Sequence, residues 1–291
     1  MGNKTKIDWC DATWNPVTGC KHGCEYCYAR RIAERFGGAS ETHNNECCHE
    51  CQWITEGTGE IHDLDEPIYD FDKGRNAPYP FDFDPTFHRY KLDEPQHWKK
   101  PRTIFVCSMA DLFGDWAPDE WIAEVFKACD AAPWHRYIFL TKNPKRLCRM
   151  AIATKVFLWN VDHPDSQVHP KTEEYVEVMR LPIRDNWWFG SSLDNADARR
   201  FDGGFNWNTF TSIEPLMEHM QMGIGSFGSD RWTIIGAETG KRKNKVVPKR
   251  AWIDNILEAA AFTGVKVFMK ESLRELMGAD FRQEFPWEVT K

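Results

Sequence analysis

Short runs of apolar and aromatic residues alternate along the chain with longer stretches in which apolar residues recur every three or four positions. The short runs are typical of buried strands, and the longer stretches are typical of helices with one buried face. Strands that alternate with helices favour a parallel sheet, because each parallel connection has to cross back over the sheet. The expected strands are TIFVCS (103–108), RYIFLT (136–141), WWFGSS (187–192), TFTSIEP (209–215), WTIIGAE (232–238) and VKVFMK (265–270), and the expected helices are Tyr28–Phe36, Pro118–Ala132, one from about Pro144, and Lys249–Phe262.

This many alternating units predicts an α/β fold, a partial (β/α) barrel of parallel strands. Residues 37–100 break the alternation, because they are polar, aromatic and proline-containing with few periodic signals. We interpret them as a cysteine-containing insertion after the first helix, at about 37–100, within a single domain over 1–291. Residues 153–185 are ambiguous and are interpreted as a second excursion from the barrel.

Polar residues gather where several of the expected strands end. Chemistry in β/α barrels takes place at the carboxyl ends of the strands, so these side chains are candidates for a functional site. A solvated loop or a helix cap is the plainer interpretation of each one. The residues are Ser108, Asp111, Thr141, Lys142, Ser191, Ser192, Glu214 and Glu238.

Composition narrows the class of protein only partly. Hydrophobic residues make up 42% of the 291 residues, and 14 tryptophans are present, which is enough for a sizeable core. The net charge of −7 argues against a general nucleic-acid coat protein but leaves room for a local basic patch. No export signal and no membrane-spanning run is visible, so we expect no membrane association and a cytoplasmic protein with reduced thiols.

Three of the ten cysteines stand in one short segment, VTGCKHGCEYCYARRIAERF, at Cys20, Cys24 and Cys27. The spacing C-x3-C-x2-C is poor for zinc, which prefers four ligands, although His22 or Cys10 could supply a fourth. It suits a 4Fe–4S cluster in which three thiolates hold three irons and the fourth iron stays open. The open iron could then chelate the amino and carboxylate groups of S-adenosylmethionine (SAM), and Tyr26, just before the last cysteine, could pack near its adenine. Cys107, Cys129 and Cys148 lie in apolar patterns and are assigned to the core.

This motif resembles that of the radical SAM superfamily, in which electron transfer from the cluster cleaves SAM and gives a 5′-deoxyadenosyl radical. The blocks DATWNPVTGC, SMADLF, LTKNPKRL, FGSSLDN, SIEPLM and GAETG, in that order, are similar to the phage-associated "three-Cys-motif" family, which is mostly of unknown function. The resemblance implies that Cys20, Cys24 and Cys27 bind the cluster. It also implies that SAM or substrate is contacted by Ser108, Asp111, Ser191, Ser192, Glu214 and Glu238. SMAD stands where the superfamily has a glycine-glycine-glutamate signature, and no residue is assigned a catalytic role.

A second cysteine cluster, NNECCHEC (44–51), lies in the expected insertion. Cys48 and Cys51 have a chelating spacing, and Cys47 stands beside them, so a second iron–sulfur cluster or a zinc ion could stabilise this polar segment. The alternative is a reduced loop without metal.

One segment departs from the acidic composition. TGKRKNKVVPKR (239–250) follows the WTIIGAE strand and therefore lies at the expected catalytic rim. Its cations Lys241, Arg242, Lys243 and Lys245 could neutralise the phosphates of a polynucleotide while one base enters the site, with Trp187, Trp188 and Trp207 as stacking surfaces. An ordinary solvated loop is the alternative.

Three functional hypotheses follow. The first is a radical SAM enzyme that modifies or rearranges a nucleic-acid base, a (hyper)modified thymidine in phage DNA. Its reaction would be an isomerisation, a lyase reaction or carbon–carbon bond formation. The second is a radical SAM enzyme on a peptide or small metabolite, and the third is a non-catalytic iron–sulfur or zinc module. The first hypothesis implies an external electron donor such as flavodoxin or ferredoxin, a DNA or modified nucleoside substrate, and the host cytoplasm as compartment.

Overall fold

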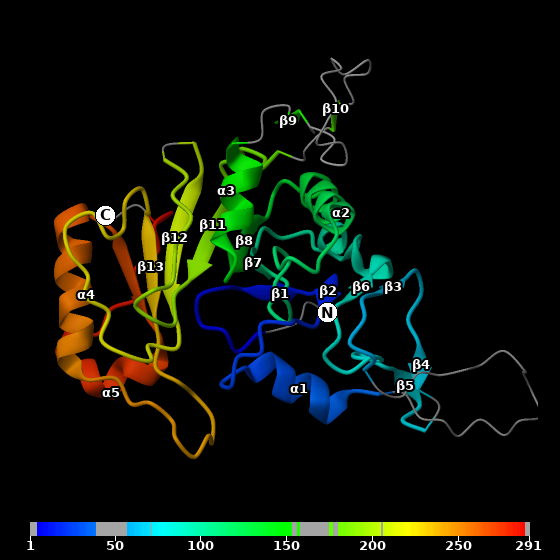
Figure 1. The fold of residues 1–291 in the computed structure, drawn as a ribbon, viewed down its shortest axis with the longest axis horizontal. Helices are drawn as coiled ribbons and strands as arrows, with labels where there is room; N and C mark the ends of the chain where they lie inside the picture. The colour runs from blue at the N-terminus through cyan, green and yellow to red at the C-terminus, as the bar shows by residue number, and fades with distance from the viewer. Residues whose placement is uncertain are drawn as a thin grey trace, which may run out of the picture.

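The computed structural model describes residues 5–38, 57–70, 72–152, 180–204 and 206–288, and of the strands β9 (Val156–Phe157) and β10 (Tyr175–Val176) the backbone only. Its centre is a seven-stranded sheet in the order β1-β7-β8-β11-β12-β13-β14, in which every neighbouring pair is parallel (Figure 1). The sheet curls into a half-barrel, so the expected partial (β/α) barrel is confirmed. The strands are β1 (Ala12–Trp14), β7 (Thr103–Val106), β8 (Arg136–Thr141), β11 (Trp187–Ser192), β12 (Asn208–Ile213), β13 (Trp232–Ile235) and β14 (Lys266–Met269).

Helices cover the convex face of the sheet, and α1 lies below the sheet in Figure 1. The helix α2 buries Trp121, Ile122 and Phe126 against Phe139 and Phe189 of the sheet. The helix α4 packs against the other half of the sheet in the same way. The helices are α1 (Tyr28–Phe36), α2 (Asp119–Asp130), α3 (Pro144–Ile152), α4 (Arg250–Thr263) and α5 (Arg274–Met277), with short 3-10 turns η1 (Arg89–Lys91), η2 (Glu94–His97), η3 (Glu271–Leu273) and η4 (Gly278–Asp280).

The concave face of the sheet is also buried, which explains why the strands have continuous apolar sequences. Alternate residues of the strands, such as Ile138, Trp188 and Phe268, form a core inside the half-barrel with Trp9. Trp187 packs on the convex side, so both Trp187 and Trp188 are buried, and the expectation that they stack on nucleic-acid bases is wrong.

The segment before β1 closes the gap between the two edge strands of the half-barrel. The Asp8 carboxylate accepts a hydrogen bond of 3.1 Å from the backbone N–H of Glu271, just after β14. The centre of the Trp9 ring lies 4.7 Å from the ring centre of Phe105 of β7 and 6.1 Å from that of Trp232 of β13. The contacts that close the gap between β1 and β14 thus join residues far apart in the sequence.

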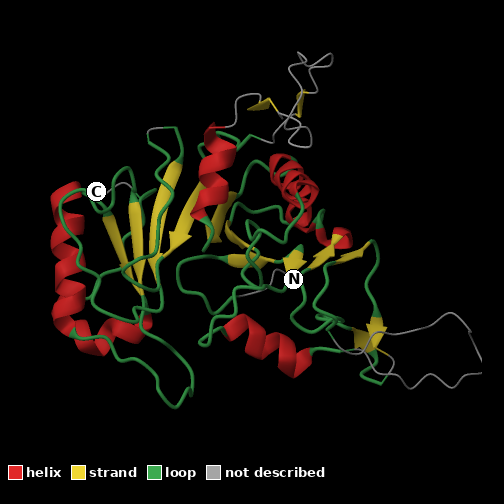
Figure 2. Cartoon of the chain, viewed as in Figure 1, coloured by secondary structure: helices red, strands yellow, loops and turns green. Residues whose placement is uncertain are grey.

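The expected insertion contributes to the fold in its second half. A small sheet joins β2 (Val17–Thr18), β6 (Thr86–His88) and β3 (His62–Leu64), while β4 (Tyr69–Asp70) pairs with β5 (Arg75–Asn76) (Figure 2). Phe87 is fully buried in the main core, and His88 is buried with its ring hydrogen-bonded to Thr18 at 2.9 Å. Burial lowers the pKa of His88 to about 2, so this histidine is neutral at physiological pH. Residues 86–88 therefore support the segment that leads into the cysteine loop.

Gly190, in the middle of β11, provides a test of the packing inside the half-barrel. A Cβ at this position would lie 2.2 Å from Cζ of Phe210, a buried side chain on the neighbouring strand. We expect Gly190→Ala to lower the free energy of unfolding by about 1–3 kcal/mol, measured by urea denaturation. The matched control is Gly223→Ala, where no atom lies within 4 Å of the added Cβ. Equal stability of the two variants would contradict this packing.

Candidate functional site

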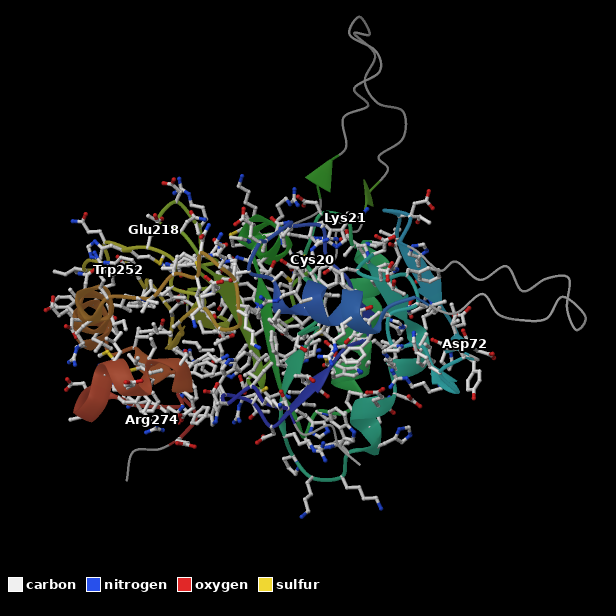
Figure 3. The ribbon with its side chains drawn as sticks, turned by 90° about the horizontal axis from the view of Figure 1, so that it is seen from below. Cys20, Lys21, Asp72, Glu218, Trp252 and Arg274 are labelled. Atoms are coloured by element: carbon white, nitrogen blue, oxygen red, sulfur yellow. The ribbon has the colours of Figure 1, made fainter. Side chains whose placement is uncertain are left out.

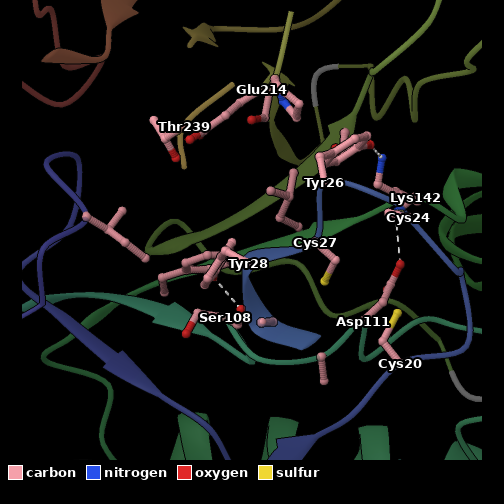
Figure 4. Close-up of a pocket in the computed structure, with 18 of the residues that line it drawn as sticks. Cys20, Cys24, Tyr26, Cys27, Tyr28, Ser108, Asp111, Lys142, Glu214 and Thr239 are labelled. Atoms are coloured by element: carbon pink, nitrogen blue, oxygen red, sulfur yellow. Dashed lines mark hydrogen bonds between the residues drawn. The ribbon is translucent and has the colours of Figure 1, made fainter. Parts of the chain in front are cut away.

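A cavity of about 600 Å³ lies at the carboxyl ends of the strands. It is lined by the cysteine loop, which we define as residues 19–27, by the start of α1 and by residues that follow five of the seven strands (Figure 4). Trp9, Phe105 and Leu140 contribute apolar surface to its lining, and Asp111, Lys142, Glu214 and Lys270 contribute charged groups. The shape and lining are those of a ligand site at the position where β/α barrels bind substrates. Figure 3 shows Cys20 and Lys21 between Glu218 and Trp252 on one side and Asp72 on the other.

Backbone contacts hold the cysteine loop in place. The Gly19 N–H donates to the carbonyl of Met109 at 2.9 Å, and the Cys20 N–H donates to the carbonyl of Phe83 at 3.1 Å. Cys27 is the N-cap of α1, and its thiol sulfur accepts a hydrogen bond from the Arg30 N–H at 3.3 Å. The helix thus starts directly at the last cysteine, as the sequence predicted.

All three thiols line the cavity, and all three are unpaired cysteines. Burial raises the pKa of Cys20 to about 12 and also raises the pKa of Cys24. A thiolate at these positions therefore needs a compensating positive charge, which a bound metal provides.

Within the described residues, no three side chains of histidine, cysteine, aspartate or glutamate are gathered into a ready metal site. Binding of a cluster therefore requires the three thiols of the loop to converge. The chemistry of the donors, three thiols from one loop facing one cavity, fits an iron–sulfur cluster with one open iron.

Asp111 connects the cysteine loop to the ends of two strands. Its carboxylate accepts hydrogen bonds from the His22 ring at 2.7 Å, from the Thr141 hydroxyl at 2.9 Å and from the Lys142 N–H at 2.9 Å. The backbone N–H of Phe113 donates to its other oxygen at 3.0 Å. With both oxygens occupied, Asp111 is placed to position the loop between Cys20 and Cys24, although it also lines the cavity.

Tyr26 belongs to a polar network beside Cys24. The Lys142 ammonium donates to the Tyr26 hydroxyl at 2.6 Å (Figure 4). It also donates to the Asp194 carboxylate at 2.5 Å, and the Tyr26 hydroxyl donates to the same carboxylate. Burial and the hydrogen bond to Asp194 raise the pKa of Tyr26, so the phenol stays protonated. Burial disfavours the charged form of Asp194, but the hydrogen bonds from Lys142 and Tyr26 outweigh it and lower the pKa of this carboxyl.

The opposite end of the cavity contains a second charged pair. Glu214, Gly236 and Lys270 directly follow the last residues of β12, β13 and β14, respectively. These last residues pair with one another across the sheet. The Lys270 ammonium donates to Glu214 at 2.5 Å across Gly236, where a Cβ would lie 3.0 Å from Lys270 Cδ. Burial raises the pKa of Glu214, against the effect of Lys270. The glycine at the end of the middle strand thus leaves room for the pair.

Glu238 is buried and bound by its own loop. Arg242 donates to both of its oxygens, at 2.7 and 2.8 Å, and the Val246 N–H donates at 3.1 Å. The hydrogen bonds from Arg242 lower the pKa of Glu238. Arg242 also contacts Glu25 of the cysteine loop at 3.3 Å. Arg242 therefore holds residues 239–246 against the site, whereas Lys241, Lys243 and Lys245 are exposed and lie outside the cavity lining.

The remaining sequence candidates divide between the cavity and the core. Ser108 and Ser192 line the cavity, and the Ser108 hydroxyl donates to the Asn15 side chain at 3.1 Å. Ser191 is buried, accepts a hydrogen bond from the Phe201 N–H at 2.7 Å and does not line the cavity. Its role as a SAM contact stays a prediction.

The assignments of the other cysteines are confirmed where the structure describes them. Cys107 and Cys129 are fully buried, and Cys148 packs against the same core. Trp207, the third expected stacking residue, is half-buried and donates its indole N–H to the Pro182 carbonyl at 3.0 Å. The expected second metal site at Cys47, Cys48 and Cys51 lies outside the described residues.

Asp194 and Lys270, which complete the two ion pairs, were not among the candidates from the sequence, and His22 was named there only as a possible zinc ligand. Lys142 was visible as a polar residue at a strand end. Asp194 and Lys270 follow strands in the same way, in FGSSLDN and VKVFMK, and that position was the available signal.

The half-barrel places this chain among α/β proteins, with a cysteine-lined cavity at the carboxyl edge of its parallel sheet. In the comparison with known families, residues 4–275 match a protein family of unknown function, DUF5131, and the chain belongs to this family. No curated protein and no solved structure matches the chain. In the described part of the chain, no helix combines the length and the apolar character needed to cross a bilayer.

Proposed function

We propose that this protein is a radical SAM enzyme whose cysteine loop binds a 4Fe–4S cluster. The observation that carries the proposal is that Cys20, Cys24 and Cys27, in C-x3-C-x2-C spacing, come from one loop and line one cavity at the carboxyl edge of a half-barrel. Cys20, Cys24 and Cys27 would hold such a cluster, which would supply one electron to the sulfonium of SAM; the C5′–S bond would then break to give methionine and a 5′-deoxyadenosyl radical.

The other cavity residues have roles that follow from their contacts. The apolar side chains of Trp9, Phe105 and Leu140 would limit the access of water to a reactive intermediate. Asp111 fixes the loop, Tyr26 presents its ring beside Cys24, and the Glu214–Lys270 pair offers both a negative and a positive group to a ligand at the far end. The cavity volume of about 600 Å³ is within the range of small-molecule and cofactor sites.

Anaerobic reconstitution with iron and sulfide tests the cluster. We expect about four irons per chain and the brown absorption of an iron–sulfur protein. Zinc, or iron in excess of this value, would indicate the second metal site at Cys47, Cys48 and Cys51. A protein that retains zinc alone would contradict the proposal and favour the non-catalytic zinc module.

We further propose that the substrate is a base in a polynucleotide, a modified thymidine in phage DNA. The support is the exposed Lys241, Lys243 and Lys245 directly after Glu238 and Thr239, which line the cavity. Arg242 supports this loop through Glu238 and is less available to a phosphate. Lysines at the rim can hold a phosphate chain while one base enters the cavity.

Replacing Lys241, Lys243 and Lys245 together with alanine is expected to weaken oligonucleotide binding. Each lost phosphate contact should reduce the slope of log affinity against log salt by about 0.7 for single strands or about 0.9 for duplex DNA. Binding titrations at two or more salt concentrations measure the slope. The matched control changes the exposed Lys99, Lys100 and Lys127 to alanine, which removes the same charge elsewhere.

An unchanged slope in the rim variant, or no salt-dependent DNA binding by the unmodified protein, would contradict a polynucleotide substrate. Either result would favour a peptide or small metabolite as the substrate of the same cavity. The cluster proposal would not be affected, because it depends on the cysteine loop.

A further inference from the structure

Lys142 and Asp194 are two opposite, half-buried charges beside the cysteine loop. Lys142 follows β8 and Asp194 follows β11, and these strands are neighbours in the sheet. Their side chains are 22% and 23% exposed, and they are 2.5 Å apart. The ammonium of Lys142 also lies 5.2 Å from the centre of the Tyr26 ring.

Both charges act on the cysteine loop. Lys142 lines the same cavity as Cys24 and donates a hydrogen bond of 2.6 Å to Tyr26, two residues after Cys24. Asp194 accepts a hydrogen bond from the same Tyr26 hydroxyl, so both charges lie next to this part of the loop. Partial burial keeps such interactions from being fully screened by water and salt. Any group bound at Cys24 therefore experiences a positive and a negative charge that partly cancel.

We propose that Lys142 and Asp194 set the reduction potential of the iron–sulfur cluster held by the cysteine loop, an inference that rests on the proposed function. Reduction adds one negative charge to a cluster, so a nearby ammonium stabilises the reduced form and a nearby carboxylate destabilises it. Net charge around the cluster is one of the factors that tune such potentials. Lys142 raises the potential, and Asp194 limits the increase.

Lys142 and Asp194 share one hydrogen bond, so replacing either residue breaks the same contact. The two replacements remove charges of opposite sign, which distinguishes an effect of charge from an effect of the lost contact. Lys142→Met removes the cation and should make the potential more negative, whereas Asp194→Asn removes the anion and should make it less negative. A general disturbance of the loop has no reason to move the potential in opposite directions. A tenfold change in the one-electron equilibrium constant corresponds to 59 mV, and we expect shifts of about this size.

The experiment is a redox titration of each reconstituted protein without SAM, followed by electron paramagnetic resonance of the reduced cluster. Lys142→Arg keeps the charge and should keep the potential. Lys127→Met, on the exposed side of α2, removes a lysine far from the loop and should also have no effect. If Lys142→Met loses its cluster, Lys142→Gln, which keeps a hydrogen-bonding end, gives the same comparison.

Shifts of the same sign in the Lys142 and Asp194 variants, or shifts no larger than that of Lys127→Met, would overturn the inference and leave the cluster proposal intact. An unmodified protein that assembles no iron–sulfur cluster would overturn both.

Discussion

Replacing Cys20, Cys24 or Cys27 with alanine, one at a time, is expected to abolish the iron–sulfur chromophore and all reductive cleavage of SAM. Three thiolates have to hold three irons, and within the described residues no other cysteine lines the cavity to substitute for a missing one. Iron analysis and the visible absorption spectrum of the reconstituted variants measure the loss.

Cys148→Ala is the matched control for these variants. Cys148 is a half-buried cysteine at the edge of the main core, and it does not line the cavity. This variant should bind as much iron as the unmodified protein. A full complement of iron in the triple alanine variant of the loop would show that the cluster, if present, is held elsewhere.

Gly19→Ala is expected to remove most of the bound iron while leaving the cysteines in the chain. Gly19 has φ +83°, and a Cβ there would lie 2.1 Å from the backbone carbonyl oxygen of Asp84. A left-handed conformation costs an alanine about 1–2 kcal/mol, and the contact with a backbone atom cannot be relieved by a side-chain rotation. The cysteine loop, and Cys20 first, has to move away from the cavity wall.

Gly23→Ala in the same loop separates the two effects. Gly23 has φ +72°, but no atom lies within 4 Å of its added Cβ, so this variant carries the conformational cost alone. We expect it to lose about 1 kcal/mol of stability and to keep its iron. Equal iron content in the Gly19 and Gly23 variants would show that the approach to Asp84 does not position the loop.

Six of the seven barrel strands and their helices could be predicted from the sequence because their signals are local, whereas β1, with three residues, was not among the expected strands. The runs RYIFLT and WWFGSS coincide with β8 and β11, and the helix after the cysteines has the expected bounds, Tyr28–Phe36. The cysteine loop was recognisable for the same reason, since its spacing is a property of eight consecutive residues, Cys20 to Cys27.

The arrangement around the loop could not be predicted, because it depends on the register of distant strands. Lys142 meets Asp194 only because β8 and β11 are neighbours, and Glu214 meets Lys270 only because a glycine ends the strand between them. Arg242 was expected to face nucleic acid as part of a basic run, but its carboxylate partner stands four residues before it. A charge run in a sequence does not show which of its members are already paired.

The buried strand at residues 86–88 could not be recognised from the sequence either. Its polar and aromatic residues suggested an insertion outside the barrel, yet Phe87 and His88 are buried against the strand that leads to the cysteines. A short strand of three residues with one buried histidine has no period long enough to identify it.

The most direct test of the central claim is the product formed from SAM. Anaerobically reconstituted protein, mixed with SAM and a strong one-electron reductant, should yield 5′-deoxyadenosine, detected by chromatography and mass spectrometry, and the Cys20, Cys24 and Cys27 triple alanine variant should yield none. Absence of 5′-deoxyadenosine from a protein with about four irons per chain, or equal amounts from the triple variant, would contradict the assignment of this cavity to radical SAM chemistry.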